Sequence, residues 1–244
     1  MLILKEQPKM EGVLLVDKPA GWTSHDVCAF LRKRFGIKKV GHAGTLDPLA
    51  TGLLVILLGR ATKFSNRLSQ TDKVYFGTMR LGVMTDSHDA TGKVIAQKPW
   101  DFVTLAMIRE HAKNFTGEIL QTPPMVSALK HQGVRLYKLA RQGKTVPREQ
   151  RRITVYEFNI EKKEEDIVFF STRVSKGTYV RTLIHDLGVS LDSCASLASL
   201  RRTHAGEFSV QKSASIDHLK NITAKELTEL IIPPYSLLHY ANSM

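Results

Sequence analysis

One glycine-rich segment, residues 41–52, gathers the groups from which a catalytic site could be built. Its sequence is GHAGTLDPLATG, in which Asp47 stands among small residues and His42 lies five positions earlier. Glycines cost conformational entropy, and a carboxylate before an apolar segment costs desolvation, so both need a compensating reason. An aspartate before proline often only starts an Asx turn. A loop of small residues that lets a ligand approach the backbone instead favours a chemical role for Asp47.

Two other chemistries fit this sequence less well. A phosphate-binding loop ends in Gly-Lys-Ser/Thr and opens a helix, whereas Gly52 leads into the apolar residues 53–58. Asp86, His88 and Asp89 could supply metal ligands, but they lack the spacing of a calcium loop. We therefore expect neither a nucleotide cofactor nor a metal.

The elements around this segment follow from local signals. Residues 12–16 are apolar and predict a buried strand that ends where Pro19 forces a loop. A helix should follow, with Thr23 or Ser24 as its N-cap and Gly36 at its C-terminus. Residues 41–52 themselves contain three glycines and a proline, which predicts a loop without regular structure before a buried strand at residues 53–58.

The rest of the chain predicts an α+β domain with a mixed or antiparallel sheet. Alternating apolar residues predict further strands, and helical spacing predicts further helices. The expected strands are 73–81, 153–160 and 167–174, and the expected helical segments are 102–115, 136–141 and 223–232. Residues 121–152 are rich in proline, glycine and cations, which indicates an inserted basic module.

Composition points to an anionic partner. The 244 residues are 43% hydrophobic, enough for one main domain with a sizeable core. Lys and Arg number 35 against 23 Asp and Glu, a net charge of +12 that favours nucleic acid over a membrane surface. Cys28 and Cys194 form no metal-binding pair. With no signal segment and no long apolar run, we expect a cytoplasmic protein.

Several segments, taken together and in order, carry a family resemblance. They are GVLLVDKPAGWTS from Gly12, GHAGTLDPLATG from Gly41, KVYFGTMRLGVMTDSHDATG from Lys73, PPMVSALK from Pro123, YKLARQGKTVPRE from Tyr137, VSKGTYVRTLIHDLG from Val174 and LRRTHAGEF from Leu200. The chain closely resembles the TruB family of tRNA pseudouridine synthases, which modify the uridine at position 55 of the T arm. The resemblance implies the pseudouridine synthase fold, with a central mixed or antiparallel sheet.

It also implies the reaction. Pseudouridine formation breaks the N1–C1′ bond of a flipped-out uridine, turns the base and rejoins it through C5, without redox change and hence without a cofactor. Asp47 matches the catalytic aspartate, which could attack the sugar carbon, stabilise it or assist deprotonation. Arg181 matches the arginine that pairs with this aspartate, and Tyr75 the tyrosine that stacks on the uracil. His42 matches the histidine that fills the gap left by the flipped base.

The remaining implied roles concern binding. Lys18 and Pro19 match a pair that supports the pocket wall, and Tyr179 and Leu200 match residues that line the uracil site. The module at residues 121–152 would hold the T arm of tRNA through its cations. These cations are Lys130, Arg135, Lys138, Arg141, Lys144 and Arg148.

The resemblance also sets expectations for the domains. We expect a catalytic domain at residues 1–204 and a short C-terminal extension at residues 205–244, too short for a complete RNA-binding domain of the PUA type. Val126 stands where the family often has an aromatic residue, so either packing beneath the module or one RNA contact should differ. We expect a monomer. The alternatives are a non-catalytic tRNA-binding or folding protein on the same scaffold and a synthase for another uridine.

Overall fold

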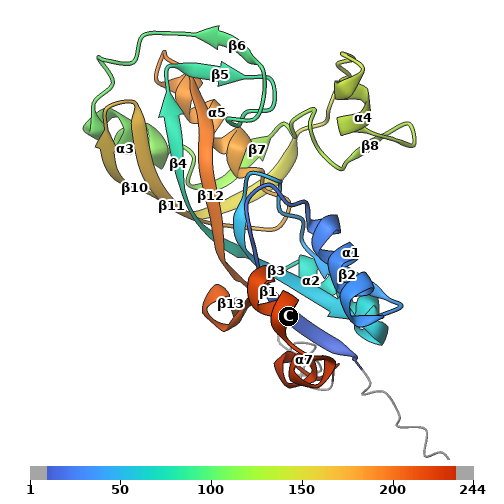
Figure 1. The fold of residues 1–244 in the computed structure, drawn as a ribbon. Helices are drawn as coiled ribbons and strands as arrows, with labels where there is room; N and C mark the ends of the chain where they lie inside the picture. The colour runs from blue at the N-terminus through green and yellow to red at the C-terminus, as the bar shows by residue number, and fades with distance from the viewer. Residues whose placement is uncertain (1–9, 235–244) are drawn as a thin grey trace, which may run out of the picture. The chain divides into compact units, whose positions relative to one another are not determined.

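The computed structural model describes residues 10–234, and the chain divides into two compact units (Figure 1). Unit 1 comprises Met1–Thr71 and Arg201–Met244, and unit 2 comprises Asp72–Leu200. One strand, β12 (Ala195–Ala205), has its first part in unit 2 and its last part in unit 1. Helices and strands occur in both units, which agrees with the expected α+β class.

Unit 1 is built around strand β3 (Thr51–Leu58). Strand β1 (Gly12–Lys18) pairs antiparallel with β3 along its whole length, and β2 (Val40–Ala43) also pairs antiparallel with β3. Arg201 and Arg202 of β12 pair parallel with the start of β3, and β14 (Ala214–Ser215) pairs parallel with β1. Residues 52–58 are all buried, as expected for a strand covered on both faces.

The other elements of unit 1 surround these strands. Phe64, Val210 and Ile232 pack against a core that includes Leu15 and Val55. The remaining elements are α1 (Ser24–Phe35), η1 (Gly59–Phe64), α2 (Ser65–Ser69), β13 (Phe208–Ser209), η2 (Val210–Lys212), α6 (Ile216–Asn221) and α7 (Ala224–Leu230).

Helix α1 confirms the sequence prediction at both ends. The Thr23 hydroxyl accepts a hydrogen bond from the Asp26 backbone N–H at 3.1 Å, and the Asp26 carboxylate accepts one from the Thr23 backbone at 2.8 Å. This capping box satisfies two N–H groups that would otherwise lack partners. Gly36 ends the helix with φ of 67°, a left-handed conformation that favours glycine.

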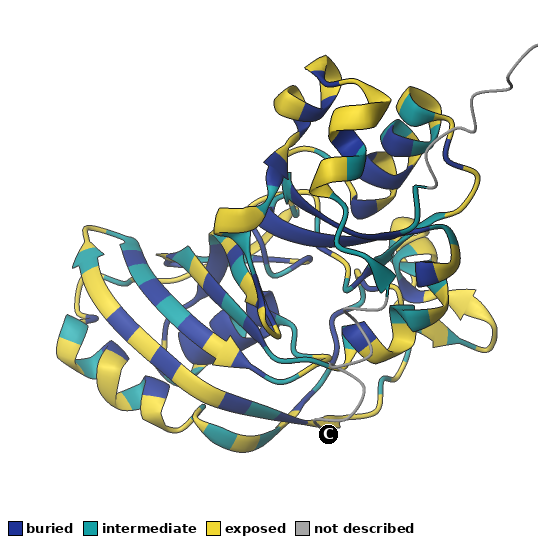
Figure 2. Ribbon diagram, turned by 90° about the horizontal axis from the view of Figure 1, so that it is seen from below, coloured by how far each residue is buried: buried dark blue, intermediate teal, exposed yellow. Residues whose placement is uncertain are grey.

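Unit 2 contains a mainly antiparallel sheet in the order β12-β4-β11-β10-β7. Strand β4 (Lys73–Leu81) pairs with β11 (Ile167–Val174), which pairs with β10 (Arg151–Glu164), and β10 pairs with β7 (Gly117–Gln121). Buried and exposed residues alternate along these strands (Figure 2), because one face of the sheet is covered and the other is open.

Helices and short strands complete unit 2. Helix α3 (Leu105–Lys113) packs on β10 and on α5 (Val180–Ser190). The remaining elements are the strand pair β5 (Val83–Thr85) and β6 (Val94–Gln97), the strand pair β8 (Lys130–His131) and β9 (Val134–Arg135), and α4 (Leu136–Arg141). No helix within residues 10–234 combines the length and apolarity needed to cross a bilayer.

The prediction of an irregular segment at residues 41–52 was wrong at both ends. Residues 41–43 belong to β2, and β3 already begins at Thr51. The backbone groups of residues 41–43 hydrogen-bond to β3, and this long-range pairing overrides the local effect of the glycines. Only residues 44–50 are irregular, and we call them the Asp47 loop.

Candidate active site

The Asp47 loop is fixed by hydrogen bonds from elsewhere in unit 1. The Ser24 hydroxyl, in the first turn of α1, accepts from the Leu46 N–H at 2.8 Å and donates to the Leu46 carbonyl at 3.1 Å. The Gly21 N–H donates to the Pro48 carbonyl at 2.9 Å. Asp47 itself is half-buried. Its neighbours on both sides are therefore held in place, which orients a carboxylate that still reaches the surface.

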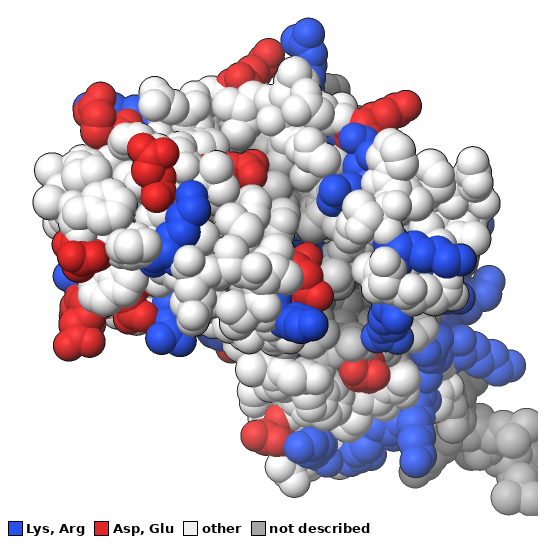
Figure 3. Space-filling view, turned by 90° about the horizontal axis from the view of Figure 1, so that it is seen from above, with Lys and Arg blue, Asp and Glu red and all other residues white. Residues whose placement is uncertain are grey.

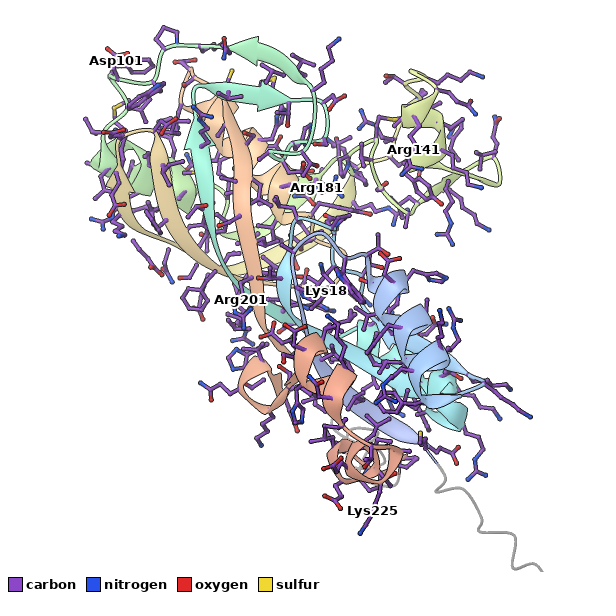
Figure 4. All side chains as sticks on the ribbon, viewed as in Figure 1. Lys18, Asp101, Arg141, Arg181, Arg201 and Lys225 are labelled. Carbon is purple, nitrogen blue, oxygen red and sulfur yellow. The ribbon has the colours of Figure 1, made fainter. Side chains whose placement is uncertain are left out.

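Lys18 ends β1 beside this loop (Figure 4) and is 0% exposed. Its ammonium group donates to the carbonyls of Trp22 at 2.6 Å, Pro19 at 2.9 Å and Pro48 at 3.4 Å. Burial lowers the pKa of Lys18 to about 8, while the nearby negative charge of Asp47 opposes this change. Lys18 thus brings a buried positive charge close to Asp47, and its bond to Pro48 joins β1 to the loop.

Arg202, on β12, is a residue that our sequence interpretation did not select. Its side chain is among the largest that are fully buried, with 1% exposure. All three guanidinium nitrogens donate to backbone carbonyls: Nε to Leu53 at 2.7 Å, Nη2 to Gly44 at 3.1 Å and Nη1 to Thr45 at 3.4 Å. The only sequence signal is its place in LRRTHAGEF, because an arginine is normally expected at the surface.

His42 lies on β2 and is half-buried. Its carbonyl accepts from the Ser65 hydroxyl at 2.9 Å, and its Nδ1 atom is buried without a hydrogen-bond partner among the described residues. Burial lowers the pKa of His42, and the positive charge of Arg202 lowers it further. The ring is therefore neutral near pH 7, the form that stacks without the cost of desolvating a charge.

Two of the candidates in unit 2, Tyr179 and Arg181, lie at the start of α5. Arg181, in the first turn of α5, is 3% exposed and donates from Nη1 to the Ser87 carbonyl at 3.2 Å. Its guanidinium carbon lies 5.6 Å from the centre of the Tyr179 ring. Gln121 fixes the Tyr179 backbone through two hydrogen bonds of 2.8 and 3.1 Å. Gln121 is thus a second supporting residue that the sequence did not reveal.

Tyr75 and Leu200 lie on neighbouring strands of the same sheet. Tyr75, on β4, is 8% exposed and sits in register with Thr172 of β11. Leu200, on β12, is half-buried, and its side chain lies against Gly77 of β4, where an added Cβ would be 3.2 Å from it. The candidates are therefore divided: Lys18, Pro19, His42 and Asp47 belong to unit 1, and Tyr75, Tyr179, Arg181 and Leu200 to unit 2.

Asp89, His88 and His185, near Arg181, make contacts within unit 2. Asp89 is buried, and its Oδ1 accepts from the Ser87 hydroxyl at 2.8 Å and the Thr91 hydroxyl at 2.6 Å. The rings of His88 and His185 are stacked, with centres 3.8 Å apart and planes 6° apart. Among residues 10–234, no group of three His, Cys, Asp or Glu side chains is placed to share a metal ion.

Comparison with known proteins places these residues in a family. Residues 32–180 match the TruB family pseudouridylate synthase (N terminal domain), and residues 181–239 match the tRNA pseudouridylate synthase B C-terminal domain. The chain belongs to the TruB family. It is 46% identical to a tRNA pseudouridine synthase B of Opitutus terrae, covering 96% of this chain and 97% of that protein. A tRNA pseudouridine synthase B of Geotalea uraniireducens is 45% identical over 95% of this chain and 75% of its own length.

Solved structures share the fold of this chain, the pseudouridine synthase fold. A chain in the crystal structure of a Cbf5-Nop10-Gar1 complex is 31% identical, with a TM-score of 0.69 over 91% of this chain. A chain in the structure of an H/ACA RNP bound to a substrate RNA containing 2'-deoxyuridine is 28% identical, with a TM-score of 0.68 over 93% of this chain. The present chain spans 60% of the length of each.

The basic module of this TruB protein presents three of its candidate cations, Lys130, Arg141 and Arg148, in different ways. Lys130 is exposed on β8, and Arg141 is exposed at the end of α4 (Figure 4), 5.6 Å from the centre of the Tyr137 ring. Arg148 is half-buried and donates to the Pro123 carbonyl at 2.9 Å. The face shown in Figure 3 carries both basic and acidic side chains, and they are not evenly distributed over it. Lys130 and Arg141 are therefore freer to meet phosphates than Arg148.

Proposed function

We propose that this protein converts uridine to pseudouridine in tRNA, at position 55 of the T arm. The observation that carries the proposal is the Asp47 loop. It presents one half-buried carboxylate between two residues whose backbones are hydrogen-bonded, Leu46 and Pro48, beside the buried charge of Lys18, in a chain of the TruB family. Tyr75 and Arg181 are both retained, which favours an enzyme over a non-catalytic tRNA-binding protein.

The reaction conserves atoms. The N1–C1′ bond breaks, the uracil turns, a C5–C1′ bond forms, and the C5 proton is lost while N1 gains a proton. We assign the attack on the sugar, or its stabilisation, to Asp47. Arg181 supplies positive charge that keeps a carboxylate ionised in a dry pocket. Tyr75 stacks on the uracil. No step requires a cofactor.

Binding roles complete the proposal. His42 fills the gap in the RNA stack, a role that a neutral ring supports. Lys18 and Pro19 support the pocket wall, and Tyr179 and Leu200 line the uracil site. The cations of the basic module, Lys130, Arg141 and Arg148, hold the T arm. We further propose a cytoplasmic monomer with its catalytic domain at residues 1–204 and a C-terminal extension at 205–244.

Tritium release from a T-arm stem-loop labelled at uridine C5 tests the assignment. Wild-type protein and Asp47→Asn would be compared in buffer with a chelator, because this substitution removes charge but little volume. We expect release by wild type alone, with near-equal binding of the stem-loop by both proteins. Tight binding by wild type without release, from the stem-loop and from full tRNA, would replace this proposal with a tRNA-binding protein or another target uridine.

A further inference from the structure

Arg202 connects three parts of unit 1 through one buried group. Its guanidinium donates to Gly44 and Thr45 at the start of the Asp47 loop and to Leu53 just beyond its end. A guanidinium is planar and presents its N–H groups in a fixed fork, so these bonds set the distance between the two ends of the loop. A buried charge is tolerated only when such partners satisfy it.

The backbone of Arg202 is held as firmly as its side chain. Arg202 pairs with Gly52 in the parallel register of β12 and β3. The two backbones approach so closely that a Cβ on Gly52 would lie 2.3 Å from the Arg202 carbonyl oxygen. Gly52 also has φ of 94°, which other residues rarely adopt. The backbone of Arg202, which carries the guanidinium, is therefore held in a fixed position next to the loop.

The charge of Arg202 also reaches other candidates in unit 1. Burial is the main cause of the lowered pKa of both Lys18 and His42, and the charge of Arg202 lowers both further. Two buried cations, Lys18 and Arg202, thus hold the same short loop, Lys18 through the Pro48 carbonyl and Arg202 through the two carbonyls at its start. The single acidic residue of the loop is Asp47.

We propose that Arg202 is a positioning residue for the reaction, which fixes Asp47 relative to the substrate without touching it. The proposal rests on the proposed function, since it assumes that Asp47 acts on the nucleotide. A displacement of about 1 Å in a reacting group can cost about 100-fold in rate. Loss of the guanidinium fork should therefore lower turnover while leaving RNA binding nearly intact.

The test compares full-length Arg202→Met and Arg202→Lys with Arg109→Met. Arg109 is the control because its guanidinium also donates to two backbone carbonyls, those of Ile160 and Glu161, but it is exposed and lies in unit 2. Two quantities would be measured: tritium release, resolved into kcat and KM, and hydrogen exchange of the peptide amides of the Asp47 loop, which reports local opening without any need for activity.

We expect Arg202→Met to lower kcat by about 100-fold, with KM within about 3-fold, and to speed exchange in the loop. Arg202→Lys keeps the charge but loses the planar guanidinium, so its kcat should fall by nearly as much. If Arg202→Met does not fold, Arg202→Lys alone provides the test. Arg109→Met should leave both quantities at wild-type values. Unchanged loop exchange, or wild-type kcat in Arg202→Lys, would overturn the proposal. A wild type without tritium release would refute the proposed function and with it this role, while exchange would still show whether Arg202 orders the loop.

Discussion

Replacing Lys18 with methionine should change how the stability of the protein depends on pH. Lys18 is 0% exposed, and burial lowers its pKa from 10.5 to about 8. Between these two values the unfolded chain binds this proton more tightly than the folded protein does. Stability therefore rises with pH across this window, because the unfolded state carries more protons there. Methionine has a similar length and does not titrate.

The size of the effect follows from the lowered pKa. A change of one pKa unit corresponds to about 1.4 kcal/mol, so a fall from 10.5 to about 8 corresponds to about 3 kcal/mol. Below pH 8 the folded protein bears the whole cost of burying the ammonium charge. Near pH 10.5 lysine is neutral in the folded state and that cost is gone. From pH 8 to pH 10.5, the free energy of unfolding of wild type should thus rise by about 3 kcal/mol relative to that of Lys18→Met.

Urea unfolding at about pH 7.5, 9 and 10.5 measures this difference. Subtracting the variant from wild type cancels the titration of every group that the two proteins share. Lys225→Met is the control, because Lys225 is an exposed lysine on α7 (Figure 4). The difference in unfolding free energy between wild type and Lys225→Met should not change with pH. A flat difference for Lys18→Met as well would refute the reasoning, since it would mean that Lys18 is not held as a buried cation.

Other consequences can be measured separately. Gly52→Ala should lower the melting temperature by far more than Gly21→Ala, because the new Cβ would lie 2.3 Å from a carbonyl oxygen, whereas Gly21 has nothing within 4 Å; equal losses would contradict this. Arg141→Gln should reduce the slope of log binding constant against log salt by about 0.7–0.9 if one phosphate contact is lost, and an unchanged slope would remove Arg141 from the RNA interface. Thr23→Ala should cost about 1 kcal/mol in urea unfolding, because it removes the helix cap, and no loss would mean that the capping box is not formed in solution.

Elements with local signals could be predicted from the sequence. Helix α1 was placed correctly because Thr23 and Gly36 mark its ends within the chain itself. Helix α5, Val180–Ser190, was missed because no side chain caps its start. Strand β2 was missed because its hydrogen bonds go to β3, and such long-range pairing leaves no trace in residues 40–43 alone.

The same distinction applies to the candidate site. Asp47 could be selected from its own surroundings, because small residues and glycines cluster beside it. Tyr75 and Arg181 could be named only through the resemblance to a family. Arg202 could not be selected from its residue type, since a charged residue on β12 predicts exposure until the carbonyls of Gly44, Thr45 and Leu53 are seen to surround it.

The division of the chain into units has a consequence for synthesis on the ribosome. Unit 2 is one continuous stretch, Asp72–Leu200, whereas unit 1 requires both Met1–Thr71 and Arg201–Met244. Domains fold as units while the chain emerges, at about 5–20 residues per second. Unit 2 can therefore fold first. The Asp47 loop is synthesised before unit 2, but it can contact Arg202 only after Arg202 has left the exit tunnel. The contacts of the Asp47 loop with Lys18, Gly21 and Ser24 can therefore form early in synthesis, whereas those with Arg202 can form only after all of unit 2 has been made.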